Sequence, residues 1–256
     1  MKILVTNDDG IDSPGLWTLV EELSKVGEVA VYAPDREQSG IGTAITLHKP
    51  VRLVPIDAPL AGVSAFGVEG TPGDSVILGL DAEDGVGMVV SGINRGANMG
   101  SDILLSGTVG GALQGYLHGL PSIAVSVQWA GDVRFDVAAR LGGLLARRIF
   151  GRGAGRAMLL NVNLPNLALE SIKGVAVTRV GRGGYSNAIG LGYDGTTDNY
   201  RIAIGQPSWS LAKGTDVHAV ETAQISITPL EGMFRTARAV PFLNGAISYL
   251  FEELRG

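Results

Sequence analysis

The sequence predicts an α/β fold built on a mainly parallel sheet, and two observations carry this prediction. Over roughly the first 165 residues, short apolar runs typical of buried strands alternate with longer segments of helical periodicity, beginning with the run Ile3-Leu4-Val5. The order strand, helix, strand at the start of the chain predicts two parallel strands joined by a right-handed crossover. Because 45% of the 256 residues are hydrophobic and 18% are charged, the chain can bury a substantial core within a single domain.

The first helix is predicted by its boundaries as well as by its periodicity. Ser13 suits the N-cap, Pro14 suits the first helical position, and Gly27 suits the C-terminal end. Its apolar positions recur at helical spacing, namely Leu16, Leu19, Val20 and Leu23. The next strand is predicted over 28–33, and it ends at Pro34.

The same alternation continues toward residue 165. Further strands are expected near 51–56, 64–68, 87–91, 121–127 and 157–162, and helices over 73–80, 108–119 and 134–150. The last of these helices mixes apolar and arginine positions, which is typical of a helix that covers one face of a sheet.

The pattern changes beyond residue 165. Strands over 175–180 and 200–205 enclose a stretch rich in glycine and polar residues, which indicates a long β-hairpin arm. A further strand is expected over 224–229, and an apolar, amphipathic terminal helix over 241–255. We therefore expect one domain over 1–256, with a core at about 1–165 and 206–230, a hairpin arm at about 175–205, and a C-terminal docking segment at about 231–256.

Composition excludes several functional classes. The chain has no cysteine, so disulfides and thiolate metal sites are excluded, and its net charge of −5 gives no basic footprint for a nucleic-acid polymer. The three histidines, His48, His118 and His218, form no zinc motif, and no P-loop motif is present. A GxGxxG pattern at 190–195 neither follows a firm strand nor opens a helix, so it does not indicate a dinucleotide site. Without a signal peptide or an apolar run near membrane length, we expect a cytoplasmic protein that does not enter a membrane.

Four loops carry polar residues out of proportion to their length, and each follows a predicted strand or opens a helix. They are Asn7-Asp8-Asp9-Gly10, the segments 34–40 and 91–102, and Ser106-Gly107-Thr108 with the glycines that follow it. Because the carboxyl ends of parallel strands meet at one edge of a sheet, we expect these loops to lie together.

The chemistry of these loops favours a hard cation beside a phosphate. Two adjacent carboxylates, Asp8 and Asp9, are costly to bury without a positive partner, and oxygen ligands suit Mg²⁺ or Mn²⁺ rather than zinc. Ser106-Gly107-Thr108 ahead of a helix offers amides and hydroxyls to an anion. Each loop taken alone also fits a simpler role: an ordinary turn at Asp9-Gly10, a structural glycine-rich loop at 91–102, or a plain N-cap at Ser106.

In their order along the chain, these loops and several shorter motifs resemble the SurE family of nucleotidases. The resemblance covers almost the whole chain and rests on NDDG at 7–10, SPG at 13–15, APDREQSG at 33–40, GTPGDSV at 70–76, SGINRGANMGSD at 91–102, SGTVGGA at 106–112, GLPSIAVS at 119–126, NVNLP at 161–165, GTD at 214–216 and SITPL at 226–230. Three positions depart from the family pattern and bear on substrate preference: Asp12, Leu105 and Gln114.

This resemblance implies a metal-dependent phosphatase that acts on nucleoside 5′- and 3′-monophosphates, with polyphosphate as a further substrate. It implies a Rossmann-like three-layer core with a protruding hairpin and a C-terminal exchange between subunits, giving a homodimer or homotetramer. Carried over by motif, one divalent cation per subunit, Mg²⁺ or Mn²⁺, has the ligands Asp8, Asp9, Ser39 and Asn94. The phosphate contacts are Asn98, Ser106, Gly107 and Thr108, and the catalytic residues are Asp8 and Asp9.

Three other functions compete with metal-dependent hydrolysis. Asp8 as a covalent nucleophile is disfavoured, because aspartyl-phosphate phosphatases usually present DxD and this chain has two adjacent aspartates. A non-catalytic nucleotide-binding protein of the stress response fits the same fold. A homo-oligomeric scaffold explains the hairpin and the terminal helix, but it does not explain four polar loops at one sheet edge.

Overall fold

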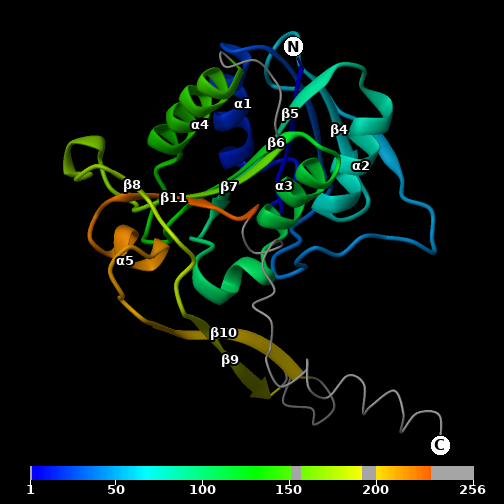
Figure 1. Cartoon of the computed structure of the whole chain (residues 1–256). Coiled ribbons are helices and arrows are strands. Elements are labelled where there is room, and N and C mark those ends of the chain that lie inside the picture. Colours follow the sequence, from blue (N-terminus) through cyan, green and yellow to red (C-terminus); the bar gives the residue numbers. More distant parts are fainter. Residues whose placement is uncertain (1, 151–156, 192–199, 232–256) are drawn as a thin grey trace, which may run out of the picture.

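A nine-stranded sheet forms the centre of the molecule, with helices on both faces (Figure 1). The computed structural model describes residues 2–150, 157–191 and 200–231. The strand order is β3-β4-β2-β1-β5-β6-β7-β11-β8. The five pairings from β4 to β7 are all parallel, whereas β3 on β4 and β11 on β7 are antiparallel, and β8 is parallel to β11. The predicted mainly parallel α/β fold is therefore confirmed.

The strands and helices match the expected order closely. The strands of the sheet are β1 (Lys2–Thr6), β2 (Glu28–Pro34), β3 (Leu53–Pro55), β4 (Ser64–Val68), β5 (Val86–Arg95), β6 (Pro121–Val127), β7 (Met158–Leu164), β8 (Val175–Val177) and β11 (Ile225–Pro229). The α-helices are α1 (Pro14–Ser24), α2 (Pro72–Ala82), α3 (Gly107–Leu117), α4 (Phe135–Phe150) and α5 (Asp216–Glu221). The short 3₁₀ turns η1 (Gly100–Leu104) and η2 (Leu169–Ser171), together with α5, were not predicted.

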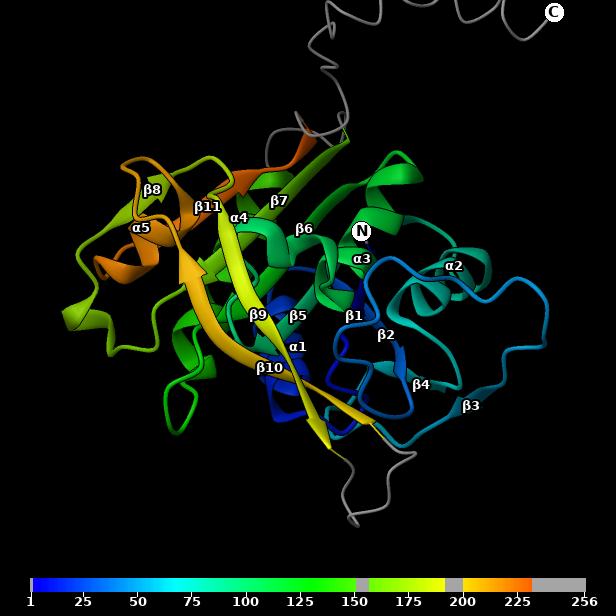
Figure 2. The same cartoon turned by 90° about the horizontal axis from the view of Figure 1, so that it is seen from below.

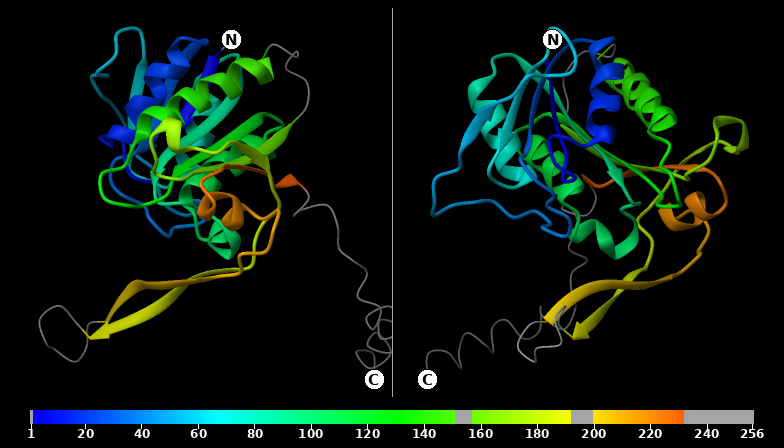
Figure 3. Two further views of the ribbon diagram at one scale, coloured as in Figure 1. Left: turned by 90° about the vertical axis from the view of Figure 1, so that its left-hand side faces the viewer. Right: turned by 180° about the vertical axis from the view of Figure 1, so that it is seen from behind.

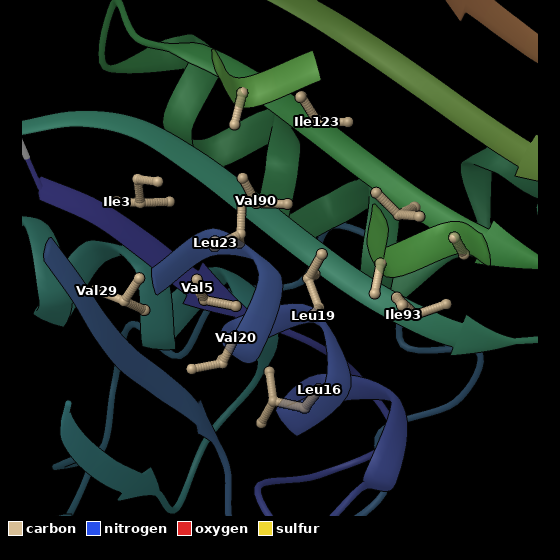
Figure 4. Close-up of a cluster of buried hydrophobic side chains, with 14 of the residues drawn as sticks. Ile3, Val5, Leu16, Leu19, Val20, Leu23, Val29, Val90, Ile93 and Ile123 are labelled. Carbon is tan, nitrogen blue, oxygen red and sulfur yellow. The ribbon is translucent and has the colours of Figure 1, made fainter. Parts of the chain in front are cut away.

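The helices form two layers, with α1 and α4 on one face of the sheet and α2 and α3 on the other (Figure 1). On the first face, Leu16, Leu19, Val20 and Leu23 of α1 point toward the sheet, where they meet side chains such as Val5 and Val90 (Figure 4). All of these side chains are fully buried. Because β1 has a helix layer on each side, its residues Ile3, Leu4 and Val5 are all buried, and this explains the unbroken apolar run.

The ends of α1 differ in detail from the prediction. Ser13 occupies the N-cap with an extended backbone, but its side chain makes no capping hydrogen bond. The helix ends at Ser24, with Lys25 rather than Gly27 as the C-cap. Pro14 lies in the first turn, as expected, so the start of the helix is fixed by the preset φ of proline.

The predicted hairpin arm is present, but one of its strands is different. It is formed by β9 (Gly183–Leu191) and β10 (Tyr200–Trp209), which pair antiparallel and extend away from the sheet (Figures 2 and 3). Residues 175–180 were expected to supply the first strand; instead Val175–Val177 forms β8, which pairs with β11 at the edge of the main sheet. Two valines at the start of this segment suit either location, since both are strands.

The predicted helix over 241–255 lies outside the described residues, as does the predicted docking segment at about 231–256 apart from Glu231. Within the described residues, no helix combines the length and the apolar character that crossing a bilayer requires.

Candidate active site

The predicted site lies at the carboxyl ends of the central parallel strands. Because β1 lies between β2 and β5, the loops that follow these three strands start side by side. Backbone hydrogen bonds join them: Gln38 N–H donates to the carbonyl oxygen of Asp8 at 2.7 Å, and Arg95 N–H donates to Asp9 Oδ2 at 3.2 Å. The loop after β1 is therefore held on one side by the loop after β2 and on the other by the last residue of β5.

Asp8 lies against the first turn of α3, where it is buried. The Thr108 hydroxyl donates a short hydrogen bond to Asp8 Oδ1. The backbone of Gly107 approaches so closely that a Cβ there would lie 2.8 Å from Asp8 Cβ and 3.0 Å from Asp8 Oδ2. Only a residue without a side chain permits this contact, so the sequence at 107 fixes how near the carboxylate comes to the helix N-terminus.

The N-terminus of α3 is capped by Ser106. Its Oγ accepts a hydrogen bond from Val109 N–H at 3.1 Å, so the plain N-cap role of this side chain is real. An accepting hydroxyl keeps its own proton, which remains free to donate. Ser106, Gly107 and Thr108 all lie at the positive end of the helix, where an anion is stabilised.

Burial raises the pKa of Asp8 from its usual value of 3.8 to about 6. The hydrogen bond from Thr108 opposes this rise, and the charge of Asp9 adds to it. Burial also raises the pKa of Asp9; the hydrogen bond from Arg95 N–H opposes the rise, and the charge of Glu37 adds to it. Two adjacent carboxyls with raised pKa values indicate that the surrounding protein does not supply enough positive charge or hydrogen-bond donors to stabilise both negative charges.

Asn94 and Ser39, the other two predicted cation ligands, differ in their hydrogen bonds. The Asn94 Nδ2 donates to the carbonyl oxygen of Gly96 at 2.7 Å, which leaves the amide oxygen of Asn94 without a hydrogen bond in the described part of the chain. Ser39 is exposed, and its hydroxyl donates to Glu37 Oε1 at 2.7 Å. Ser39 makes no hydrogen bond to Asp8 or Asp9 among residues 2–150, 157–191 and 200–231, so its link to them passes through Glu37, whose charge acts on Asp9.

Asn98 is held by residues of β6 and β7. Its side-chain Nδ2 lies 2.9 Å from Ser126 Oγ on β6, and its backbone is bound by Asn161 and Asn163 on β7. The described residues include no hydrogen bond between Asn98 and Thr108 or Asp8.

Two residues that support the loop after β1 were missed from sequence. Asn7 is fully buried, and its Nδ2 donates to the carbonyl oxygen of Gly10 at 2.8 Å, which closes the turn that carries Asp8 and Asp9. Gly10 has φ +97°, and a Cβ there would come within 3.1 Å of the Arg36 backbone. The second is Glu37 in the polar loop at 34–40, whose charge raises the pKa of Asp9. The asparagine before the two aspartates was a usable signal, because asparagine commonly bonds the backbone of turns.

The donor set fits a hard cation. The described residues contain no cluster of three or more His, Cys, Asp or Glu suited to a metal, so a metal here must combine the two carboxylates with amide and hydroxyl oxygens. Three buried polar atoms lie at the end of β1 and beside it on β5 and have no hydrogen-bond partner in the described part of the chain: Thr6 Oγ1, Asn7 Oδ1 and Ser91 Oγ. These observations are compatible with the ligands expected from the sequence and do not require a different set.

The fold and this site define an open, Rossmann-like α/β protein whose polar loops meet at the carboxyl edge of a parallel sheet. A family model described as survival protein SurE matches residues 3–187. The chain therefore belongs to the SurE family.

Curated relatives and a solved structure agree with this assignment. A protein of Dehalococcoides mccartyi (strain CBDB1), named 5′-nucleotidase SurE, is 44% identical over 234 residues, which cover 90% of this chain and 88% of the relative. A protein of Moorella thermoacetica with the same name is 46% identical over 233 residues, which cover 90% of each chain. The crystal structure of the SurE protein from Aquifex aeolicus superimposes with a TM-score of 0.78 at 36% identity, over 98% of this chain and 99% of that one.

Proposed function

We propose that this chain is a 5′-nucleotidase that hydrolyses nucleoside 5′-monophosphates to nucleoside and phosphate with the help of one divalent cation, Mg²⁺ or Mn²⁺. The relatives named 5′-nucleotidase SurE support the reaction and the substrate class. The observation that carries the proposal is the contact between Asp8 and the first turn of α3, because it brings a cation-binding carboxylate and an anion-binding helix end together.

In this proposal Asp8, Asp9, Ser39 and Asn94 hold the cation through oxygen atoms. Asn94 suits the role because its amide nitrogen donates to Gly96, while its amide oxygen accepts no hydrogen bond from the described residues. A cation held there would neutralise charge on the phosphate and lower the pKa of a water beside it. Asp9, the more accessible of the two carboxylates, then orients the attacking water and takes up its proton.

The residues at the N-terminus of α3 bind the phosphate, and their hydrogen bonds divide the work between them. A hydroxyl has one proton, and Thr108 spends its proton on Asp8, so Thr108 positions the carboxylate and meets phosphate through its backbone N–H. Ser106 accepts from Val109 N–H and keeps its proton for a phosphate oxygen. Gly107 allows the phosphate to approach the backbone, and Asn98 adds a contact from the loop after β5.

The resemblance extends the proposal beyond 5′-monophosphates. We include 3′-monophosphates and polyphosphate as substrates and a homodimer or homotetramer as the assembly. A cytoplasmic location belongs to the same set of expectations. The alternative is a non-catalytic nucleotide-binding protein on the same fold, which binds a nucleotide without releasing phosphate.

The deciding experiment measures phosphate release from a panel of nucleoside 5′- and 3′-monophosphates and from polyphosphate, with Mg²⁺, Mn²⁺ or chelator. We expect release that requires the cation. Asp9→Asn removes one negative ligand and the proton acceptor, so kcat should fall at least about 100-fold at saturating cation. The matched control is Asp84→Asn, which makes the same charge change at an exposed position before β5, at the opposite end of the sheet.

Wild-type turnover by Asp9→Asn at saturating cation would remove Asp9 from the mechanism. Tight nucleotide binding without phosphate release under every metal condition would favour the non-catalytic alternative. A phosphoryl group trapped on Asp8 would instead assign the covalent route.

A further inference from the structure

Two fully buried asparagines of β7, Asn161 and Asn163, direct their side chains at the loop that carries Asn98. Asn163 makes two bonds to the Asn98 backbone: its Oδ1 accepts from Asn98 N–H at 2.8 Å, and its Nδ2 donates to the Asn98 carbonyl oxygen at 3.0 Å. Asn161 Nδ2 donates to the same carbonyl oxygen at 2.8 Å. One amide side chain thus satisfies both backbone groups of Asn98, in the way that a neighbouring strand would.

The Asn98 side chain is oriented by a third buried residue. Its amide lies 2.9 Å from the hydroxyl of Ser126 on β6, and Ser126 is fully buried. Backbone and side chain of Asn98 are therefore fixed by residues of β6 and β7, two strands that carry none of the proposed cation ligands.

Burying asparagine side chains in a sheet is costly unless their hydrogen bonds are made, and Asn161 Oδ1 still has no partner among the described residues. Apolar residues would fill the same positions at lower cost, since neighbouring Leu159 and Val162 are buried in the core. The motif NVNLP at 161–165 is one of those that carry the family resemblance, yet none of its residues takes part in the proposed reaction. A role in holding Asn98 accounts for this polar pair.

We infer that Asn163, supported by Asn161, is a positioning residue that sets Asn98 for contact with the substrate phosphate. This inference rests on the proposed function, which places Asn98 on phosphate. Its effect is separable from cation binding, because Asn94 lies in β5, where it pairs with β6, and Gly96 just after it has its own anchor: its N–H donates to the carbonyl oxygen of Val127 at 2.8 Å. Loss of Asn163 should therefore loosen Asn98 and leave the cation ligands in place.

The test compares Asn163→Ala with Asn166→Ala in the full chain. Asn166 is the control, because its side chain also binds the backbone of a single loop, here 130–134. It donates to the carbonyl oxygens of Ala130 and Asp132 and accepts from Arg134 N–H. We measure KM and kcat for nucleoside monophosphates, inhibition by inorganic phosphate, and Mn²⁺ affinity by calorimetry. For Asn163→Ala, KM and the phosphate inhibition constant should rise about 10-fold to 100-fold while Mn²⁺ affinity stays within about twofold. Asn166→Ala should leave all three unchanged.

A double-mutant cycle separates positioning from general damage. Once Asn98→Ala has removed the side chain, adding Asn163→Ala should raise KM no further. The inference would be overturned if Asn163→Ala raised KM by the same factor in the wild type and in Asn98→Ala. An unchanged phosphate inhibition constant in Asn163→Ala would also overturn it. If Asn163→Ala does not fold, Asn161→Ala, which removes one bond of the three, is used in the same cycle and should raise both constants by a smaller factor.

The same set of proteins keeps the two proposals distinguishable. If the wild type releases no phosphate, the proposed function fails, and binding of inorganic phosphate in the presence of Mn²⁺ is then compared by calorimetry. Phosphate affinity that is lower in Asn163→Ala than in wild type and Asn166→Ala still supports the inference, and equal affinity in all three contradicts it.

Discussion

Asp8 is the residue at which stability and the proposed function oppose each other. It is buried just after β1, beside a second carboxyl. The Thr108 hydroxyl and the N-terminus of α3 stabilise its charge. Among the described residues, no basic side chain forms a hydrogen bond with it. Its raised pKa shows that these donors do not offset the cost of burying the charge. The fold therefore tolerates a carboxylate that it does not need for packing, which is typical of a functional site.

This opposition predicts a pH-dependent stability for the cation-free protein. The pKa of Asp8 is raised from 3.8 to about 6, so the folded state binds the proton more tightly than the unfolded state. Stability should fall as the pH rises from about 4 to about 6 and then level off, by about 3 kcal/mol at about 1.4 kcal/mol per pH unit. Asp8→Asn should accordingly raise the melting temperature in chelator by several degrees near pH 7.5 and by about half as much near pH 5.

Calorimetric or fluorescence melting of both proteins in chelator at the two pH values checks this expectation. Added Mn²⁺ should raise the melting temperature of the wild type and have little effect on Asp8→Asn. A variant that is less stable than the wild type near pH 7.5 in chelator would contradict the sign of the argument.

Gly107 sets the distance between Asp8 and α3, and this predicts a loss of activity without a loss of fold. In Gly107→Ala the new Cβ would lie 2.8 Å from Asp8 Cβ, so the carboxylate must move. Alanine also favours the helix, so the free energy of unfolding should change by no more than about 1 kcal/mol while kcat/KM for a nucleoside monophosphate falls at least about tenfold. Gly67→Ala is the control, because a Cβ at Gly67 has no neighbour closer than 3.9 Å. Equal kcat/KM in the two variants would show that the close approach at Gly107 has no part in the site.

At the scale of elements, the segment between β5 and α3 is fixed at several points by side chains from elsewhere in the chain. Asn163 holds its middle, and the fully buried Asp216 at the start of α5 holds Gly100, whose N–H donates to Asp216 Oδ2 at 3.0 Å. Asp216 Oδ1 also accepts from Gly181 N–H at 2.7 Å, just before the hairpin begins. One carboxylate thus joins the base of the hairpin to the loop that leads into the candidate site.

Asp216→Asn tests this junction. In the variant, the amide NH₂ replaces one of the two carboxylate oxygens and faces a backbone N–H, so that buried donor loses its acceptor. The free energy of unfolding should therefore fall by about 1–3 kcal/mol. Urea unfolding of the full chain measures the change, with Asp81→Asn at an exposed position of α2 as the control. Equal stability of the two variants would mean that Asp216 does not carry the junction.

Local patterns predicted most elements, and they failed where the choice depended on distant partners. The strand positions 64–68 and 121–127 were predicted residue for residue, because apolar runs bounded by turn residues are local signals. Residues 175–180 have the same local character, but whether they join the hairpin or the sheet edge depends on β11, some 50 residues later. The short α5 was missed because six residues give too little periodicity.

At the scale of the whole molecule, the sequence predicted which loops come together, but it did not predict the hydrogen bonds between them. The rule that ligands bind beyond the carboxyl ends of parallel strands located Asp8, Asp9 and Asn94 at one edge. It gave no means of seeing that Thr108 bonds Asp8, or that Asn163 bonds Asn98 from 65 residues away, since those contacts exist only once the sheet is assembled.

The place of β1 in the middle of the sheet has a consequence for how the chain folds as it is made. One side of β1 pairs with β2 some 25 residues later, but the other side pairs with β5, from Lys2↔Val86 to Thr6↔Ser91. At about 5–20 residues per second of synthesis, an apolar strand waits roughly 4 to 20 seconds with one edge open. Charged residues near such a strand discourage association between nascent chains, and Asp8 and Asp9 follow β1 after a single residue, Asn7. The two aspartates that the proposed chemistry needs in the folded enzyme thus also discourage association of the nascent chain.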